Sequence, residues 1–368
     1  MEEKNLLDEA RKIINEVDAE MAELFVKRMK AVEMVAEHKR LYGLPILDES
    51  REAVVLRKGS ERVKDDTLRE YYVNFIKNNM AISRSYQQRL LEGMKVAYSG
   101  TEGAFAHIAT RKLFPGSTYV PFGDFPSAYA AVECGDCDAV VLPIENSYNG
   151  EVGQVMDLMF SGNLYVNSMY ELAVSQDLLT VPGAQKSDIK TVVSHPQALG
   201  QCAEYIRAHG WETVEYNNTA LAAKYVAEKG DKSVAAIASA EASDIFGLDV
   251  MEKNINESRS NTTRFAAFTR SKNTSGDSAM GEHFILVFTV KNEAGALARA
   301  IDIIGRCGFN MRTLRSRPMK ELLWQYYFYV ETEGNLDTER GRKMLEELSS
   351  MCDMVKVIGS FDYPSELR

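Results

Sequence analysis

The sequence has few cysteines, no excess of positive charge and no long apolar run, and each absence excludes a class of protein. Five cysteines in 368 residues are sparse and odd in number, which excludes a disulfide scaffold and fits reduced thiols. Lys and Arg total 43 against 53 Asp and Glu, a net charge of −10. The basic footprint of a nucleic-acid partner is therefore absent. No run of 18 apolar residues exists, so no membrane-spanning helix is expected.

What is present fits a multidomain cytoplasmic protein. The first 20 residues are acidic and amphipathic, without the basic start and apolar core of a signal peptide. Apolar residues make up 45% and charged residues 26%, as in ordinary globular proteins. At about 150 residues per domain, the length predicts two or three domains.

The first 92 residues are predicted to form an all-helical domain, broken only around residues 43–48 and 59–66. In the first segment, apolar residues recur at helical spacing for roughly ten turns, with no glycine or proline before Gly43. A helix this long exceeds what a compact single-chain domain holds. We therefore expect it to pack against a second copy, in a homo-oligomer that is a dimer or a tetramer.

Two cations interrupt the apolar face of this first helix. Arg28 and Lys39 are eleven residues apart, so at about 100° per residue they lie within roughly 20° of each other. Cations on a core face are costly unless an anionic group meets them there. The pattern predicts an anionic ligand, with a structural glutamate paired to Arg28 as the alternative.

Polar residues also interrupt the third predicted helix. Ser83 and Gln87 are i,i+4 neighbours on a face that Tyr72, Ile76 and Met80 make otherwise apolar. A buried glutamine without a partner costs about 1–3 kcal/mol. A partner for Gln87 is therefore expected.

Arg11 lies about 100° around the first helix from Arg28, so it reaches such a site more easily from a paired chain. Over about 85 residues this pattern resembles the all-helical chorismate mutase family, in which an intertwined dimer holds chorismate and one protomer lends an arginine to the other. The resemblance is carried by Arg11, Arg28, Lys39, Asp48, Arg51, Glu52, Ser83 and Gln87.

The chemistry of that family suits these residue types. Chorismate is a dicarboxylate that rearranges to prephenate without a nucleophile, so the enzyme holds the compact conformer and stabilises charge on the ether oxygen. The resemblance implies that Arg11 and Arg28 bind the carboxylates, and that Lys39 and Gln87 donate to the ether oxygen. It implies that the hydroxyl and the second carboxylate are held by Asp48, Glu52 and Ser83, supported by Arg51.

From residue 94 onward the pattern changes to short apolar runs, such as Val96–Tyr98 and Val234–Ala238, each followed by a polar turn. Helical stretches follow most of them, which is the βαβ rhythm of a parallel sheet. Ligands of such sheets bind at the carboxyl ends of the strands. The polar turns are therefore candidate ligand contacts.

Four sequence strings in this region are more specific. They are AYSGTEGAFAH at 97–107, PIENS at 143–147, SHPQALGQC at 194–202 and TTRF at 262–265. Across residues 94–270 they resemble prephenate dehydratase, whose fold has two α/β lobes, like periplasmic binding proteins, with the site in the cleft between them. One departure is Ala106, where that family usually has serine.

The dehydratase reaction expels the ring hydroxyl of prephenate together with its ring carboxylate as CO2, so it needs one proton donor and groups that hold two carboxylates. The resemblance implies Thr263 as the donor, with Asn146 and Gln201 orienting the substrate. A threonine hydroxyl is a poor acid, so Thr263 needs a polarising neighbour that the sequence does not identify. Carboxylate contacts are implied for Ser147, Ser194 and Arg264.

Other reactive side chains of this region have structural interpretations. His195 precedes a proline where a helix starts, so we predict a turn residue, with general-acid catalysis as the alternative. Cys202 lies within a helical pattern and is predicted as a small core residue. Cys134 and Cys137 form a CxxC without a second Cys or His pair nearby, so neither a metal nor a cofactor is expected.

Residues 271–281 are polar and non-periodic, and we predict a linker there. Residues 282–363 then follow the βαββαβ order of a ferredoxin-like α+β fold. This segment resembles the ACT domain, a module that binds amino acids at dimer interfaces. The two strings that carry the resemblance are Gly295-Ala296-Leu297-Ala298 and Arg315-Ser316-Arg317-Pro318.

The resemblance implies a site for L-phenylalanine, and Gly295 lets a ligand approach the helix N-terminus closely. An interface module without a ligand is the alternative. Dehydratases of this family usually carry glutamate in place of Arg315, so the charge beside the expected ligand is reversed. The implied contacts are Gly295, Ala296 and Leu297 of one chain with Ser316, Arg317 and Pro318 of the other.

Together the resemblances imply a bifunctional enzyme of phenylalanine biosynthesis. It would convert chorismate to prephenate and then to phenylpyruvate, under feedback by L-phenylalanine. The alternative is a two-lobed solute-binding sensor fused to an amino-acid-responsive module. The expected lack of a signal peptide and the cations of the first helix argue against that alternative.

Overall fold

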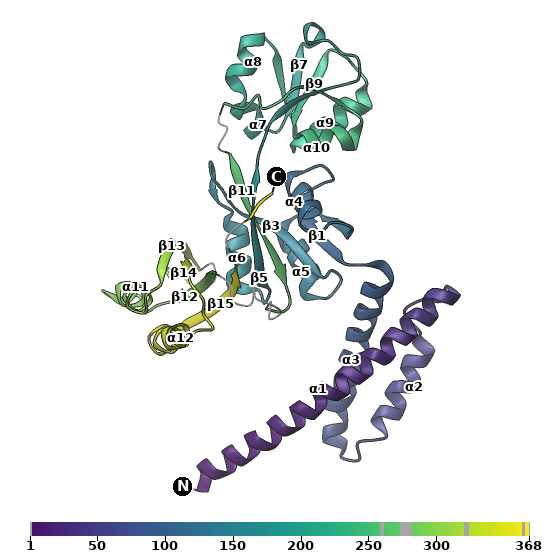
Figure 1. The fold of residues 1–368 in the computed structure, drawn as a ribbon, viewed down its shortest axis with the longest axis vertical. Coiled ribbons are helices and arrows are strands. Elements are labelled where there is room, and N and C mark those ends of the chain that lie inside the picture. The colour runs from purple at the N-terminus through teal and green to yellow at the C-terminus, as the bar shows by residue number, and fades with distance from the viewer. Residues whose placement is uncertain (1, 258–260, 273–281, 320–323, 363–364, 368) are drawn as a thin grey trace. The chain divides into compact units, whose positions relative to one another are not determined.

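The computed structural model describes residues 2–257, 261–272, 282–319, 324–362 and 365–367 (Figure 1). The chain divides into two compact units, residues 1–94 and 95–368. Within the described ranges, no helix has the length and apolarity that a membrane span requires.

The first unit is all-helical, as predicted. It consists of α1 (Glu2–Tyr42), α2 (Glu49–Ser60) and α3 (Asp66–Glu92), and both α1 and α2 pack against α3. Asp65 begins α3 by accepting the N–H groups of Thr67 at 2.8 Å and Leu68 at 3.1 Å, which satisfies two otherwise unpaired helix donors. Gly59 is buried where α2 meets α3. A side chain at this position would contact Ile76 of α3.

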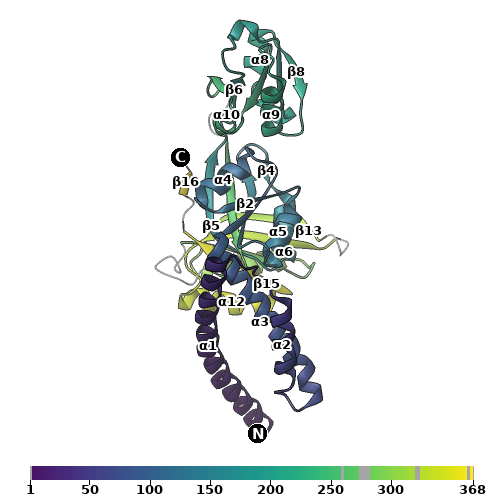
Figure 2. The same cartoon turned by 90° about the vertical axis from the view of Figure 1, so that its right-hand side faces the viewer.

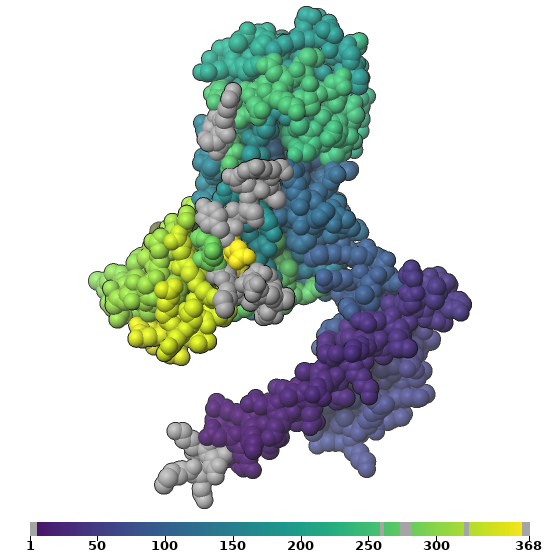
Figure 3. All heavy atoms as spheres, viewed as in Figure 1, coloured from purple at the N-terminus to yellow at the C-terminus, as the bar shows by residue number. Residues whose placement is uncertain are grey.

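The N-terminal half of α1 is apolar and uncovered. Leu24 is 63% exposed and Ile14 56% exposed, and Figures 1 and 3 show this half of α1 extending beyond α2 and α3. An apolar stripe of this length in water is the mark of an interaction surface.

The second unit begins with a sheet of seven strands in the order β16-β5-β11-β3-β1-β2, with β4 paired to β3. The sheet is mixed, which corrects the expected parallel sheet: β1 lies parallel to β2 and β3, whereas β11 runs antiparallel to β3 and β5. The strands are β1 (Lys95–Ser99), β2 (Thr118–Phe122), β3 (Ala139–Asn146), β4 (Gly150–Glu151), β5 (Tyr165–Ala173), β11 (Thr262–Thr269) and β16 (Ser365–Leu367). The helices are α4 (Phe105–Leu113), α5 (Phe125–Glu133) and α6 (Gly153–Ser161).

The chain leaves this first lobe after β5, builds a second lobe, and returns as β11, which explains the reversed direction of β11. The second lobe holds a five-stranded sheet in the order β10-β6-β9-β7-β8, and Figure 2 shows the two lobes as separate bodies. Its strands are β6 (Asp177–Thr180), β7 (Thr191–Ser194), β8 (Glu212–Glu215), β9 (Val234–Ala238) and β10 (Asp249–Glu252). Its helices are η1 (Lys186–Asp188), α7 (Pro196–Gln201), α8 (Ala203–His209), α9 (Thr219–Lys229) and α10 (Ala240–Phe246).

The two lobes touch beside the polar turn at the end of β1. Gly103 has a positive φ of +83°, and a methyl group there would lie 3.1 Å from the Phe246 ring and 3.3 Å from the Ala220 side chain. Lys112 and Glu241 form an ion pair across the lobes at 3.4 Å. The two-lobed architecture predicted from the sequence is present.

The C-terminal part has the predicted βαββαβ order and an antiparallel sheet in the order β13-β14-β12-β15. Strand β12 alternates, so that Phe284, Leu286 and Phe288 pack under the helices, whereas Ile285 and Val287 join the core of the first lobe. The predicted linker at 271–281 lies outside the described residues except for 271 and 272. The elements are β12 (His283–Thr289), α11 (Ala296–Arg306), β13 (Asn310–Pro318), β14 (Tyr326–Glu333), α12 (Glu339–Met351) and β15 (Met354–Phe361).

Strand β15 crosses the first lobe at close range. A methyl group at Gly359 would overlap the carbonyl group of Val166 on β5. Lys356 donates from Nζ to the carbonyl oxygens of Met159 at 2.8 Å and Phe160 at 3.1 Å, where the negative end of the α6 dipole favours a cation. The C-terminal sheet is therefore seated on the first lobe through backbone contact as well as apolar packing.

We predict that Gly359→Ala lowers the free energy of unfolding by about 1–3 kcal/mol, because overpacking forces the two strands apart. Urea unfolding followed by circular dichroism measures the change. Gly305→Ala in α11 is the matched control, since a methyl group there meets no atom within 4 Å. A Gly359→Ala midpoint equal to that of Gly305→Ala would show that the close crossing is not needed.

Candidate active sites

A pocket of about 230 Å³ lies among the three helices of the first unit. Of the residues predicted for the mutase site, all but Arg11 line it. They are Arg28 and Lys39 from α1, Asp48, Arg51 and Glu52 at the start of α2, and Ser83 and Gln87 from α3. The sequence pattern therefore identified a real cavity.

The two cations that α1 contributes to this pocket bind uncharged partners. Arg28 donates from Nη1 to the Asn79 carbonyl oxygen at 3.3 Å and to the Ser83 hydroxyl. Lys39 donates to the Ile46 carbonyl oxygen. Within the described ranges no carboxylate lies at ion-pair distance from either cation, so the structural glutamate considered for Arg28 is not found. The pocket lining holds four cations against two carboxylates, and this excess of positive charge favours an anionic ligand.

The acidic residues of the pocket are held by α2 and α3. Asp48 accepts from the Arg51 N–H at 2.9 Å and the Ser50 hydroxyl at 2.7 Å, and these bonds lower the pKa of the Asp48 carboxyl. Glu52 pairs with Arg84, a pocket residue that the sequence analysis missed. No pattern in the sequence marks Arg84 as a pocket residue. Its role becomes visible only in the structure, where α2 packs against α3.

Only the nitrogen of the buried Gln87 side-chain amide has a hydrogen-bond partner among the described residues. Its Nε2 donates to the Ser83 carbonyl oxygen at 3.3 Å, whereas its buried Oε1 has no partner. Arg11 is exposed on α1, outside the pocket.

The second unit contains a cleft of about 340 Å³ between its two lobes. Asn146 at the end of β3 and Thr263 on β11 line it from the first lobe, and Gln201 of α7 lines it from the second. A smaller pocket of about 240 Å³ shares Gln201 with the cleft. Three predicted residues from distant parts of the sequence therefore meet here.

Asn146 and Thr263 are opposite each other in the register of β3 and β11. The Asn146 Nδ2 donates to Thr263 Oγ1 at 2.9 Å, and its Oδ1 accepts the N–H groups of Tyr148 and Asn149, both at 3.0 Å. A backbone N–H can only donate, so these two bonds fix which way the amide points. This bond polarises the Thr263 hydroxyl and uses its oxygen as acceptor, so that the hydroxyl hydrogen can be donated to another group.

Further amides that the sequence analysis missed surround this pair. Asn261 accepts from Asn146 at 2.8 Å. Gln176, only 3% exposed, donates to Gln201 Oε1 at 3.2 Å, while its own Oε1 is buried without a partner. Gln176 lies in the connection from β5 to β6, where no motif marks it. Asn261 directly precedes the TTRF string, which could have drawn attention to it.

Three residues expected to contact carboxylates do not line the cleft. Ser194 is fully buried and donates to the Ile237 carbonyl oxygen at 2.5 Å, where it links β7 to β9. The Ser147 hydroxyl accepts the Thr262 N–H at 3.0 Å. Arg264 lies on the reverse face of β11, because successive side chains of a strand point to opposite faces. The burial of Ser194 and the orientation of Arg264 correct the expectation for these two residues.

His195 and Cys202 both have local structural contacts. His195 begins α7 by accepting the Gln197 N–H at 3.2 Å, and its side chain also borders the cleft. Burial raises the pKa of the Cys202 thiol to about 12, so it is a core residue and a poor nucleophile. Among the described residues no cluster suited to a metal ion is found.

In the C-terminal domain, Gly295 begins α11 with a positive φ of +81°. Ser316 and Pro318 on the edge strand β13 are exposed, whereas Arg315 and Arg317 point to the first lobe. Arg317 donates to Glu151 at 2.8 Å and Asp157 at 3.0 Å. The charges of Arg315 and Arg317 therefore lie on the face of β13 opposite to Ser316. This corrects the expectations that Arg315 adjoins a ligand and that Arg317 contacts one.

Comparison with known proteins covers both units. Residues 96–273 match the family model of prephenate dehydratase, and residues 10–88 match that of type II chorismate mutase. A bifunctional chorismate mutase/prephenate dehydratase of Aquifex aeolicus is 30% identical, with 98% of each chain covered.

Two solved structures are similar to the second unit. A prephenate dehydratase from Arthrobacter aurescens in complex with L-Phe is 25% identical with a TM-score of 0.67, covering 73% of this chain and 90% of that one. A protein described as GqqA, a novel type of quorum quenching acylase, is 31% identical with a TM-score of 0.67, covering 74% of this chain and 98% of that one.

The match to an enzyme with both activities extends over nearly the whole chain, which the alternative of a solute-binding sensor does not explain. Each activity also has a family match over the unit that contains the corresponding cleft. The chain therefore belongs to the bifunctional chorismate mutase/prephenate dehydratase family, and it catalyses the rearrangement of chorismate to prephenate and the conversion of prephenate to phenylpyruvate in phenylalanine biosynthesis.

Proposed function

We propose that the two reactions occur in two separate clefts, under control of a third domain. In this proposal residues 1–92 form the mutase domain, 94–270 the dehydratase domain, 271–281 a linker and 282–363 an ACT regulatory domain. The observation that carries it is the contrast between the clefts. One holds two cations, Arg28 and Lys39, that are not paired with a carboxylate, and the other holds a hydroxyl polarised by an amide.

In the mutase cleft, Arg28 binds a substrate carboxylate and Lys39 donates to the ether oxygen. Both side chains contact only uncharged oxygens in the free protein, so a dianionic substrate adds charge pairing that the protein itself does not supply. Gln87 is the second donor to the ether oxygen. The hydroxyl and the second carboxylate are held by Asp48, Glu52 and Ser83, with Arg51 in support.

The mutase site is completed by Arg11 of a second chain. The exposed apolar stripe on the N-terminal half of α1 supports a dimer, because association would remove that surface from water. Arg11 belongs to the same exposed half of α1. A homodimer, or a tetramer built from it, would then be the active form.

Mixing two inactive variants tests this arrangement. We predict that Arg11→Ala and Lys39→Ala each lower mutase turnover by about 10²–10³-fold, the usual loss for one charged donor in a dry site. In a mixed dimer, one site would have an intact Lys39 and an intact Arg11 from the partner. Random exchange should therefore restore roughly a quarter of wild-type activity.

The readout is chorismate consumption after the two variants are unfolded together and refolded. Each variant refolded alone is the control, and both should keep dehydratase activity on added prephenate. A mixture no more active than the single variants would mean that Arg11 serves its own chain or none.

In the dehydratase cleft, Thr263 donates the proton to the leaving hydroxide while Asn146 polarises it. Gln201 orients the ring, and the unpartnered Oε1 of Gln176 accepts a substrate hydroxyl. Since Arg264 faces away, the carboxylates are held by backbone N–H groups at the starts of α4 and α9, which begin at Phe105 and Thr219 in the cleft. Neither reaction requires a cofactor.

Three variants test the donor. We predict that Thr263→Ala lowers dehydratase turnover by at least about 10²-fold, as expected for loss of a general acid, while Thr263→Ser keeps part of the rate. Thr269→Ala, at the far end of the same strand, should have wild-type turnover. Prephenate consumption measures each rate. Equal rates for the Ala and Ser variants at position 263 would make Thr263 a structural residue.

The regulatory domain binds L-phenylalanine between two chains, with Gly295, Ala296 and Leu297 of one facing Ser316 and Pro318 of the other. Support comes from the left-handed Gly295 at the start of α11 and from the exposed Ser316 and Pro318 on an edge strand. The similar Arthrobacter enzyme was solved with L-Phe. A cytoplasmic location suits the five free cysteines.

Calorimetry tests this regulation. We predict that phenylalanine binds, and that a non-reactive prephenate analogue weakens its binding by the same factor by which phenylalanine weakens the analogue, because coupling is reciprocal. Typical couplings correspond to about 5–150-fold. No binding up to millimolar phenylalanine, or an affinity indifferent to the analogue, would contradict the proposed control.

A further inference from the structure

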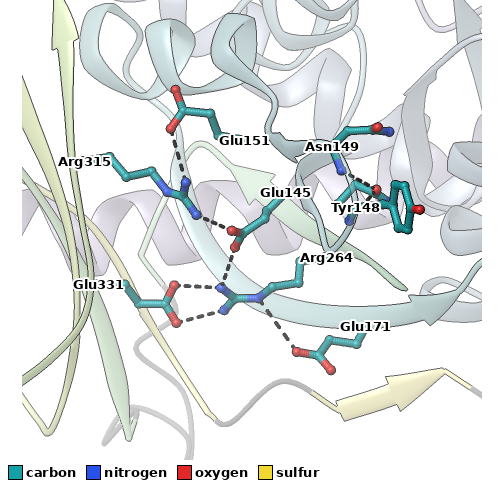
Figure 4. Close-up of polar contacts among 9 residues, drawn as sticks. Glu145, Tyr148, Asn149, Glu151, Glu171, Arg264, Arg315 and Glu331 are labelled. Carbon is teal, nitrogen blue, oxygen red and sulfur yellow. Dashed lines mark hydrogen bonds and ion pairs between the residues drawn. The ribbon is translucent and has the colours of Figure 1, made fainter. Parts of the chain in front are cut away.

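The reverse faces of the two catalytic strands carry charged residues that the reaction does not use. Glu145 precedes Asn146 on β3, Arg264 follows Thr263 on β11, and the two are paired in the register of these strands. Because side chains alternate along a strand, Asn146 and Thr263 face the cleft while Glu145 and Arg264 face the C-terminal domain. Figure 4 shows this charged face.

Arg264 is surrounded by carboxylates. It forms a two-pronged pair with Glu331 of β14, at 2.8 and 2.9 Å, and Glu331 is only 3% exposed. Its strand neighbours Glu145 and Glu171 lie at 3.5 and 3.9 Å. Burial alone would lower the pKa of Arg264, but the bonds to Glu331 raise it above its ordinary value. Three carboxylates thus lie within ion-pair distance of the single positive charge of Arg264.

Arg315 supplies a second cation to this cluster. It reaches from β13 to Glu145, and its Nη1 lies 3.5 Å from Glu151 of β4 (Figure 4). Without Arg315, the Glu145 carboxylate would compete with Glu171 and Glu331 for the single charge of Arg264. An incompletely neutralised carboxylate in a half-buried site is costly, and Glu145 would be expected to turn toward solvent.

A turn of Glu145 would disturb the catalytic pair. Glu145 and Asn146 are consecutive, and the Asn146 amide is aimed by backbone N–H groups of Tyr148 and Asn149 in the turn between β3 and β4. Glu151, the other partner of Arg315, lies on β4 at the far end of that turn. Arg315 therefore contacts both sides of the turn that aims the Asn146 amide at Thr263.

We propose that Arg315 is a positioning residue for the dehydratase reaction, which holds the β3–β4 turn through Glu145 and so makes the Asn146–Thr263 pair depend on the placement of β13. This inference rests on the proposed roles of Asn146 and Thr263. Ser316 lies on the opposite face of β13 and is exposed, so a ligand bound there would move the same strand that carries Arg315.

The test measures dehydratase kinetics of Arg315→Met, which removes the charge and keeps most of the length. We expect kcat to fall about tenfold, as for a small misplacement of a catalytic group, with KM within twofold because Gln201 and the helix N-termini are untouched. Arg315→Lys should recover at least half of the lost rate. Mutase turnover of the same samples should stay at the wild-type value.

Arg312→Met is the matched control, since Arg312 lies on the same strand and its pair with Glu333, at 2.5 Å, stays within the C-terminal domain. It should have wild-type kcat. Glu145→Gln should lose as much rate as Arg315→Met, and the double variant should lose no more, because both act through one contact.

An Arg315→Met kcat within twofold of wild type, or additive losses in the double variant, would overturn the inference. The Thr263→Ala variant distinguishes failure of the positioning role of Arg315 from failure of the proposed function. If Thr263→Ala is active, the site assignment is wrong; if Thr263→Ala is inactive while Arg315→Met is normal, only the positioning role is wrong.

Discussion

The antiparallel pairing of β3 with β11 is the constraint on which the second unit depends. It joins β3 of the first lobe to β11, the strand that returns from the second lobe. It also places Asn146 opposite Thr263 at the edge of the cleft. The same register sets Glu145 against Arg264 on the reverse face, where the C-terminal sheet packs. A shift of the register by one residue would exchange the side chains of the two faces. It would therefore disrupt both the cleft and the contact with the C-terminal sheet.

Local patterns predicted much of the fold. The three helices and their breaks followed from periodicity and from glycine positions, and the cations on the apolar face of α1 both line a cavity among the three helices. Arg28 and Lys39 line that pocket together because eleven residues bring a helix back to nearly the same angle. The βαββαβ order of the C-terminal part was likewise readable, since each of its elements is strongly periodic.

The errors arose where a position depends on contacts distant in sequence. The sheet was expected to be parallel because the βαβ rhythm reveals helices between strands but not the direction of β11, which comes back from another lobe. The family resemblances implied that Arg264 contacts a substrate carboxylate and that Arg315 lies beside the phenylalanine ligand. Their carboxylate partners, Glu331 and Glu145, lie 67 and 170 residues away, and no local pattern connects them.

The central claim is that the dehydratase site is built around the Asn146–Thr263 pair, with Arg264 outside it. A crystal structure with a non-reactive prephenate analogue tests this most directly. The account predicts the ring hydroxyl of the analogue within about 2.6–3.2 Å of Thr263 Oγ1, while Arg264 stays paired with Glu331. An analogue bound by Arg264, or one whose hydroxyl lies away from Thr263, would contradict it.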